Sequence, residues 1–327
     1  MILRVVIIGA GRSHKNEAAI GRAVESLGLP SLVINAVTWT QNLGRLAAPL
    51  LQRRIEAFEP DVLICSRHAL LLGEARLRSL FRGRYSAFWY FDLRIPPIKD
   101  VITLGRLVDT MYTTYAPQVE VFRQHGIERV LHLPQGMDPE LDRPAPDPIP
   151  AAFRCDVVFV GSGKFENRFA VLRAVSGVAK LHIRGTDWER APADMPVVGG
   201  PVYGPAYAQT VSGAAISLGA NSLPEMAAQH GSASNRMWKV MGCGGFYLGE
   251  WVEGLDAFAR HGEHCAWYRQ PGEAAELARY YLDRPDERRA IAAAGREHAL
   301  AHHTYAHRVR LLLDRRGYDA ASPQTMV

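Results

Sequence analysis

Short apolar segments alternate with longer amphipathic segments along most of the chain. Leu3–Ile8 is a mostly β-branched run that ends at Gly9, which is typical of a buried strand in a parallel sheet. Asn16–Leu27 follows with the pattern of a helix. The second half repeats the theme, with strands predicted at Cys155–Val160, Leu181–Arg184, Ala214–Leu218 and Phe246–Leu248. This alternation predicts an α/β protein built on parallel sheets.

The remaining elements extend this pattern and suggest two domains. Strands are also predicted at Ser31–Ala36, Asp61–Cys65, Ser86–Phe91, Val108–Tyr112 and Val130–Leu133, and helices at Gln41–Phe58, Leu70–Phe81, Ala116–His125, Gly272–Leu282 and Arg288–His302. Asp138–Pro150 is rich in Pro and Asp, which neither a helix nor a strand tolerates. We therefore expect a first domain over residues 1–150 and a second over residues 151–305.

Composition agrees with two folded domains and narrows the class of protein. The chain has 327 residues, 48% of them hydrophobic and 22% charged, which is enough for two sizeable cores. Its net charge of +5 fits an anionic ligand or acceptor but does not by itself indicate nucleic acid or a membrane surface. The four cysteines form no C-x-x-C pair, and no apolar run is long enough for a signal or a membrane span. These features predict a soluble, cytoplasmic protein with reduced thiols.

Polar residues follow two strands of the first half at their carboxyl ends, where ligands of doubly wound domains lie. Ser66, Arg67 and His68 come after Asp61–Cys65, and Asp92 comes directly after the strand that ends at Phe91. A charge in this position is a candidate acid or base, although it can also be solvated or structural. Asp92 is the first candidate for a catalytic base, and His68 is another.

The loop from Gly9 to His14 invites a dinucleotide-binding hypothesis, which we reject. The third glycine of that fingerprint is replaced by His14, and the strand Ser31–Ala36 lacks the acidic residue that would hold a ribose. His14 still lies in a loop at the carboxyl edge of the sheet. It is therefore a third candidate base.

Two stretches of the second half have the composition of a phosphate site. Gly161 and Gly163 open the stretch G-S-G-K-F-E-N-R, in which Lys164 and Arg168 supply positive charge; its spacing is not that of a Walker A loop. Ser232 and Ser234 precede a helix that begins at Asn235 and carries Arg236 in its first turn. A capped helix start next to an arginine suits a phosphate group, whereas an ordinary cap and solvated charges are the alternative.

The segment around Arg236 resembles the donor-binding segment of GT-B glycosyltransferases, in particular the CgeB-like branch. The family pattern is an Arg, a Glu or Lys three residues later, a Gly-rich turn, a strand and Gly-Leu. Its positions here are Arg236, Lys239, Gly242, Gly244, Gly245, Gly254 and Leu255. The similarity covers residues 156–308 and ends in H-T-Y-A-H-R at His303–Arg308. Leu133–Asp138 also resembles the turn that ends the first domain in many GT-B enzymes.

The resemblance implies two Rossmann-like domains that face a central cleft, and a closing helix near Tyr305–Arg315 that crosses back to the first domain. The closing helix and the tail together make up a last segment over residues 306–327. It implies transfer of a sugar from a nucleotide diphosphate sugar, such as a UDP-sugar, to an acceptor hydroxyl. The acceptor, which stays open between a small molecule, a polysaccharide, a protein and modified DNA, would bind on the first domain. The donor would bind on the second, and domain closure would exclude water.

The resemblance also assigns roles to particular residues. Donor and phosphate contacts would fall to Gly161, Gly163, Lys164, Arg168, Ser234, Asn235, Arg236, Lys239, Gly244 and Gly245. The nucleotide base and ribose would lie near Gly185, Trp188, Tyr203 and Tyr207. The chain has no D-x-D motif, so we expect a metal-independent enzyme without a cofactor, in which cationic groups neutralise the leaving diphosphate.

One departure from the family pattern leaves an alternative open. Many retaining relatives carry two glutamates eight positions apart, and the aligned positions here are Gly231 and Lys239. Lys239 has precedent in the CgeB-like branch, but the missing carboxylates leave the donor sugar contacts and the stereochemistry undecided. A non-catalytic nucleotide-sugar-binding or scaffold protein is therefore the alternative, and an oxidoreductase that uses the Gly9 loop is a third hypothesis.

Several histidines near the carboxyl terminus raise the possibility of a metal site. His298/His302 and His303/His307 have i, i+4 spacing, but no set of cysteines or carboxylates converges with them in the sequence. A helix end rich in histidine is the preferred interpretation.

Overall fold

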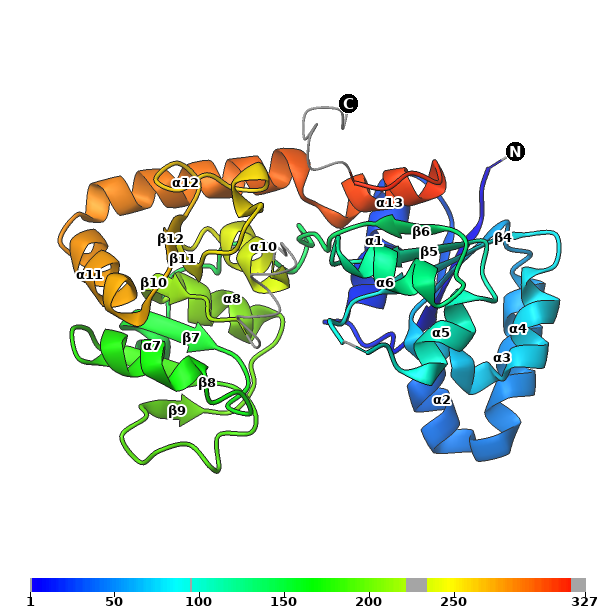
Figure 1. The fold of residues 1–327 in the computed structure, drawn as a ribbon, viewed down its shortest axis with the longest axis horizontal. Helices are drawn as coiled ribbons and strands as arrows, with labels where there is room; N and C mark the ends of the chain where they lie inside the picture. The colour runs from blue at the N-terminus through cyan, green and yellow to red at the C-terminus, as the bar shows by residue number, and fades with distance from the viewer. Residues whose placement is uncertain (1, 95, 222–233, 319–327) are drawn as a thin grey trace. The chain divides into compact units, whose positions relative to one another are not determined.

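A computed structural model describes residues 2–94, 96–221 and 234–318 (Figure 1). Contacts divide these residues into two compact units, the first made of residues 2–135 and 305–318 and the second of residues 136–304. The division falls earlier than residue 150, because residues 136–150, including the Pro- and Asp-rich stretch, group with the second unit.

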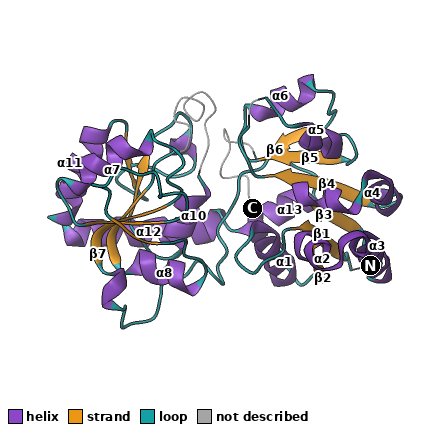
Figure 2. Cartoon of the chain, turned by 90° about the horizontal axis from the view of Figure 1, so that it is seen from below, coloured by secondary structure: helices purple, strands orange, loops and turns teal. Residues whose placement is uncertain are grey.

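The first unit is a six-stranded parallel sheet in the order β2-β1-β3-β4-β5-β6. The central strands β1, β3 and β4 are buried along their whole length, since helices cover both faces of the sheet (Figure 2). The strands are β1 (Val5–Gly9), β2 (Ser31–Asn35), β3 (Val62–Cys65), β4 (Tyr85–Tyr90), β5 (Thr110–Thr113) and β6 (Val130–His132). The α-helices are α1 (Asn16–Ser26), α2 (Ala36–Leu43), α3 (Ala47–Ala57), α4 (Glu74–Phe81), α5 (Lys99–Gly105), α6 (Gln118–Gln124) and α13 (Tyr305–Leu313).

The second unit is a six-stranded parallel sheet in the order β12-β11-β10-β7-β8-β9. Its strands are β7 (Cys155–Val160), β8 (Leu181–Arg184), β9 (Val197–Gly199), β10 (Ala214–Leu218), β11 (Tyr247–Glu250) and β12 (Ala266–Tyr268). Its α-helices include α7 (Arg168–Ser176), α8 (Pro205–Ser212), α10 (Asn235–Gly242), α11 (Pro271–Leu282) and α12 (Pro285–His302). The α/β class and the parallel sheets predicted from the sequence are confirmed.

Glycines break two helices that hydrophobic periodicity predicted as continuous. The predicted helix Gln41–Phe58 is interrupted at Gly44, which has a φ of 51°, and it becomes the end of α2, the 3₁₀ turn η1 (Gly44–Leu46) and α3. The predicted helix Leu70–Phe81 is interrupted at Gly73, which has a φ of 83°, and it becomes the 3₁₀ segment η2 (Arg67–Leu72) and α4. A positive φ is open to glycine at little steric cost, so the chain turns at these points while its apolar pattern continues.

The last described helix returns to the first unit, as the family resemblance implied. α13 packs against α1, and the Tyr305 hydroxyl donates a hydrogen bond of 3.0 Å to Asn16 Oδ1. Arg308 is fully buried, and its Nε donates to the carbonyl of Pro134 at 3.1 Å. The carboxyl-terminal helix therefore completes the first unit.

His132 at the end of β6 gives the first unit a predicted dependence of stability on pH. Burial, followed by the positive charge of Arg308, lowers the pKa of His132 from 6.5 to about 4, although a hydrogen bond with the Thr114 backbone acts in the opposite sense. The unfolded chain therefore binds more protons than the folded chain between pH 6.5 and pH 4. The stabilisation is present above pH 6.5 and is lost as the pH falls toward 4.

We expect the free energy of unfolding of the first unit to fall by up to about 3 kcal/mol between pH 7 and pH 4 because of this group. A His132→Gln variant should flatten that slope in urea titrations followed at several pH values. His125→Gln, in the same unit, is the matched control. If His132→Gln leaves the slope unchanged, the assignment to His132 is wrong.

Candidate active site

The loops at the carboxyl edge of the second sheet bring together the predicted phosphate-binding residues. Because the strands are parallel, the loops after β7, β8 and β10 lie at the same edge, together with Glu250 at the end of β11. These loops begin at Gly161, Gly185 and Gly219. The start of α10 reaches this edge as well, because the Arg236 side chain contacts the last residue of β7 and the loop after β10.

Glycines let the first two of these loops touch backbone to backbone. The N–H of Gly163 donates to the carbonyl of Thr186 at 2.9 Å, and a Cβ on Gly185 would lie 1.8 Å from the carbonyl oxygen of Gly161. Gly185 also has a φ of 151°, which favours glycine. Gly161, Gly163 and Gly185 thus have a structural reason to be glycine.

Arg236 joins the helix start to the strand ends. Ser234 is the N-cap residue of α10, and its hydroxyl oxygen accepts a hydrogen bond from the Arg236 backbone N–H at 3.3 Å. The guanidinium Nε donates to the carbonyl of Val160 at 3.0 Å, and Nη1 donates to the carbonyl of Ala220 at 3.2 Å. The guanidinium is therefore held in a fixed position at the carboxyl edge of the sheet.

Arg168, the first residue of α7, lies at the same edge and is 6% exposed. Its Nη1 donates to the carbonyl of Ser162 at 2.8 Å. Burial, followed by the positive charge of Arg236, lowers the pKa of Arg168 to about 9, so the two guanidinium groups are close enough to repel each other. Glu250 offsets part of this repulsion. Two cations that share one nearby carboxylate favour the binding of an anion.

Other predicted donor residues lie elsewhere or point elsewhere. Lys239 Nζ is 3.0 Å from the carboxylate of Asp142 and 5.4 Å from the centroid of the Tyr207 ring, so an ion pair already neutralises it. Gly244 and Gly245 lie between the end of α10 and the start of β11, which is the amino edge of the sheet. Because this edge is opposite the one that carries Arg236, the turn is separate from the cationic site.

Lys164 and Asn235 remain near the carboxyl edge. The backbone N–H of Lys164 donates to Ser162 Oγ at 3.2 Å, and its side chain is exposed. The buried Oδ1 of Asn235 has no hydrogen-bond partner among the described residues. Ser232 and Gly231 lie outside the residues that the structure describes.

Of the aromatic residues predicted near the base, two have covered rings. Trp188 is buried, makes ring contacts with Phe159 and Phe169, and donates its indole N–H to the carbonyl of Gly161 at 3.0 Å. Tyr207 is buried within α8. Neither ring presents a face for stacking in this structure. Tyr203 is 51% exposed in the loop before α8.

The candidate bases of the first unit lie at the carboxyl edge of its sheet. Asp92 follows β4, is half exposed, and has a carboxylate oxygen 3.9 Å from Arg67 Nη1. His68 lies in η2, and its buried Nδ1 has no hydrogen-bond partner in the described part of the chain. Burial, followed by the charge of Arg67, lowers the pKa of His68, so its imidazole is neutral near pH 7 and able to accept a proton.

A cavity of about 730 Å³ opens beside these residues. Arg67, His68 and Leu71 line it from η2, and Ile98 and Lys99 line it from the start of α5. His14 lies in the loop between β1 and α1 at the same sheet edge and does not line this cavity. The first unit thus offers a concave site lined by His68, whereas Asp92 does not line it and reaches it only through Arg67.

Two carboxylates at the carboxyl edges of the two sheets were not among the site residues predicted from the sequence. Glu250 accepts a hydrogen bond from the Asn221 N–H at 2.8 Å, and burial raises the pKa of its carboxyl. Glu17 is buried and accepts from the Ala10 N–H at 2.9 Å and from the Ser66 hydroxyl at 2.6 Å. Glu250 is the last residue of an apolar strand, and Glu17 lies in the first turn of a helix that follows a Gly-containing loop. These positions in the sequence could have identified both carboxylates.

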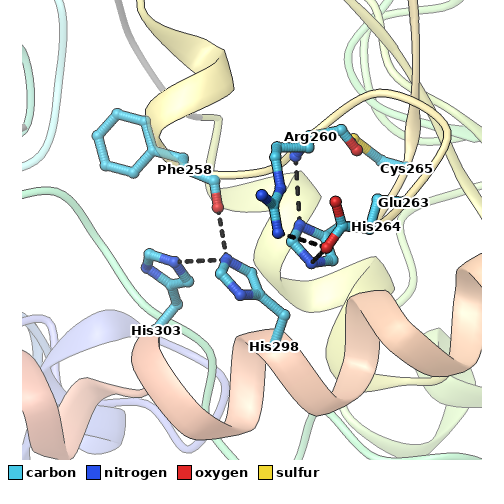
Figure 3. A network of polar contacts seen from close by, with 7 residues as sticks. All are labelled: Phe258, Arg260, Glu263, His264, Cys265, His298 and His303. Carbon is cyan, nitrogen blue, oxygen red and sulfur yellow. Dashed lines mark hydrogen bonds and ion pairs between the residues drawn. The ribbon is translucent and has the colours of Figure 1, made fainter. Parts of the chain in front are cut away.

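The carboxyl-terminal histidines form a network within the second unit (Figure 3). His298 Nε2 donates to the carbonyl of Phe258 at 2.7 Å and lies 3.1 Å from His303 Nε2, while the rings of His298 and His264 stack with centroids 4.0 Å apart. His307, by contrast, lies in α13 of the first unit. Over residues 2–94, 96–221 and 234–318, no group of three or more His, Cys, Asp or Glu side chains is arranged to hold a metal ion.

No helix in the part of the chain that the structure describes has both the length and the apolar composition needed to cross a membrane.

Comparisons with known proteins agree with this architecture. Residues 167–314 match the glycosyl transferase-like family. HepE from Anabaena, solved in complex with UDP and glucose, is 14% identical and has a TM-score of 0.65, and the alignment covers 96% of this chain and 99% of HepE. No curated protein matches the chain in sequence.

Two further solved structures have the same fold. Sucrose-phosphate synthase from Thermosynechococcus elongatus is 13% identical with a TM-score of 0.60, over 96% of this chain and 98% of that one. A glycosyltransferase from Rickettsia africae is 10% identical with a TM-score of 0.61, over 96% and 97%. The predicted GT-B fold is therefore confirmed.

Proposed function

Because residues 167–314 match the glycosyl transferase-like family, we propose that this protein transfers a sugar from a nucleotide diphosphate sugar to an acceptor hydroxyl without a metal ion. The observation that carries the proposal is the pair of guanidinium groups, Arg168 and Arg236, at the carboxyl edge of the second sheet. HepE, which has the same fold, was solved with UDP-glucose, so we take UDP-sugars as the first donors to test.

The two arginines would act on the leaving group. When the bond between sugar and diphosphate breaks, negative charge develops on the departing oxygen and must be stabilised. Arg236 is held by two backbone carbonyls and Arg168 by one at less than 3 Å, so both charges are placed before the reaction begins. The peptide N–H groups at the start of α10 add to the same field. Lys164 is an additional exposed cation at this edge.

The first unit would bind the acceptor in the cavity beside η2 and α5. Asp92 or the neutral His68 would remove the proton of the acceptor hydroxyl as the sugar is transferred, with His14 as a further candidate. The residues that contact the donor sugar and the stereochemistry of transfer are left open by this assignment.

Nucleotide binding tests the proposal directly. We expect UDP to raise the unfolding midpoint of the protein in buffer that contains EDTA, with GDP, TDP and ADP compared at the same concentration. NAD should have no effect. If no nucleoside diphosphate stabilises the protein, the proposed donor site is wrong. A requirement for a divalent cation would contradict metal independence.

The observation on Lys239 supports a second candidate function, a nucleotide-sugar-binding protein without catalysis. Lys239 occupies a position where many relatives carry a glutamate, and here Asp142 neutralises it. Release of UDP from UDP-glucose in the presence of an acceptor separates the two functions. Binding without release over a panel of acceptors would favour the non-catalytic protein.

A further inference from the structure

Three leucines are exposed on one corner of the first unit. Leu43 ends α2, Leu46 lies in the 3₁₀ turn η1, and Leu50 lies in the first turn of α3. Leu46 is 65% exposed, and Leu43 and Leu50 are 40% and 41% exposed. Leu46 and Leu50 are four residues apart and lie on the same side of the start of α3, whereas Leu43 comes just before the turn at Gly44. Figure 1 shows that α2 and α3 project together from one side of the sheet of this unit.

Fold stability does not account for the exposure of these leucines. Ala47, Leu51 and Ile55 already form the side of α3 that packs into the core of the first unit. Single exposed apolar residues are common, but a group of large ones on one corner marks a surface that contacts something else.

Exposed arginines accompany the leucines. Arg45 lies between Leu43 and Leu46 in the sequence, and Arg53 and Arg54 follow Leu50 by three and four residues. None of these three arginines forms an ion pair with another of the described residues. We refer to Leu43, Arg45, Leu46, Leu50, Arg53 and Arg54 as the leucine–arginine face.

The excess of positive charge extends beyond this face. Residues 36–84 contain eight arginines and four carboxylates; Arg76 is also exposed, whereas the exposed Arg67 and Arg78 pair with Asp92 and Glu74. Leu71, 43% exposed on η2, adds a further apolar side chain on an element that packs against both α2 and α3. Apolar side chains flanked by basic ones suit a binding partner that has an apolar interior beneath an anionic surface.

We propose that the leucine–arginine face docks on the surface of an anionic phospholipid membrane. The leucines would enter the region between headgroups and acyl chains, and the arginines would contact lipid phosphates. A second copy of this chain fits less well, because in a two-fold interface the same arginines would face one another.

Vesicle binding by the whole protein tests this inference independently of any glycosyltransferase activity. We expect the protein to sediment with vesicles of phosphatidylcholine and phosphatidylglycerol at low salt, to bind pure phosphatidylcholine at least tenfold more weakly, and to be released by high salt. The double substitution Leu46→Glu with Leu50→Glu should weaken partitioning at least tenfold. Arg45→Gln with Arg53→Gln should reduce the dependence on salt.

A matched control separates the effect of the face from the effect of charge. Val197 and Val198 on β9 are 39% and 44% exposed, so Val197→Glu with Val198→Glu makes the same change of charge on the second unit. That variant should bind vesicles like the unmodified protein, and UDP should stabilise all variants equally. Binding that is absent, or that survives Leu46→Glu with Leu50→Glu, would overturn the inference. So would a concentration-dependent dimer in sedimentation that the same double substitution dissociates.

Discussion

Replacing Arg236 with alanine is expected to weaken UDP binding by about 30- to 150-fold. Hydrogen bonds to a charged partner are worth about 2–3 kcal/mol, and the alanine variant loses the fork that would hold the diphosphate. The neighbouring Arg168 would keep part of the attraction, so we expect residual binding rather than none. Isothermal titration of UDP into both proteins measures the difference.

Two further variants separate binding from structure, because Arg236 also holds the carbonyls of Val160 and Ala220. Arg236→Lys keeps the charge but not the planar fork, and it should lie between the native protein and the alanine variant. Arg173→Ala removes an exposed arginine of α7 that pairs with Asp194, and it should bind UDP normally. Unchanged affinity in Arg236→Ala would remove Arg236 from the donor site.

Asp92→Asn is expected to lower the rate of sugar transfer about 1000-fold while UDP affinity stays the same. The amide keeps the shape of the carboxylate but cannot take a proton from the acceptor, and general-base catalysis typically contributes 10²–10⁴-fold. Asp92 lies in the first unit and the predicted UDP contacts lie in the second, so the loss should be confined to turnover. Release of UDP under saturating donor measures it.

The neighbouring His68 provides the decisive comparison. If His68→Gln loses turnover and Asp92→Asn does not, the base is His68 and Asp92 serves only as the partner of Arg67. Glu120→Gln is the matched control, since it removes an exposed carboxylate of α6 that pairs with Arg123. If neither Asp92→Asn nor His68→Gln changes the rate, the catalytic assignment in this unit fails, although the donor site does not.

The local pattern of apolar residues predicted which helices and strands form, but it did not show where the helices are interrupted. The apolar runs predicted β7 with its observed bounds and β1 to within two residues, because strands whose central residues are buried leave a continuous apolar signal. Gly44 and Gly73 interrupt helices that the apolar pattern predicted as continuous, because the spacing of apolar residues does not reveal a change of φ at a glycine. The strand β9 was missed because it has only three residues and its two valines are exposed, so its apolar signal is short.

By itself the sequence determined the α/β class, the parallel sheets, the GT-B fold and the loops that carry glycine and positive charge. Each depends on residues close together in the chain, or on an ordered series of motifs. The tertiary structure decided which charges meet. The order of β11, β10, β7 and β8 brings Arg168, Arg236 and Glu250 to one edge, while Lys239 turns to Asp142. Such pairings depend on which strands become neighbours and on how deeply each charge is buried. The spacing of residues along the chain determines neither of these.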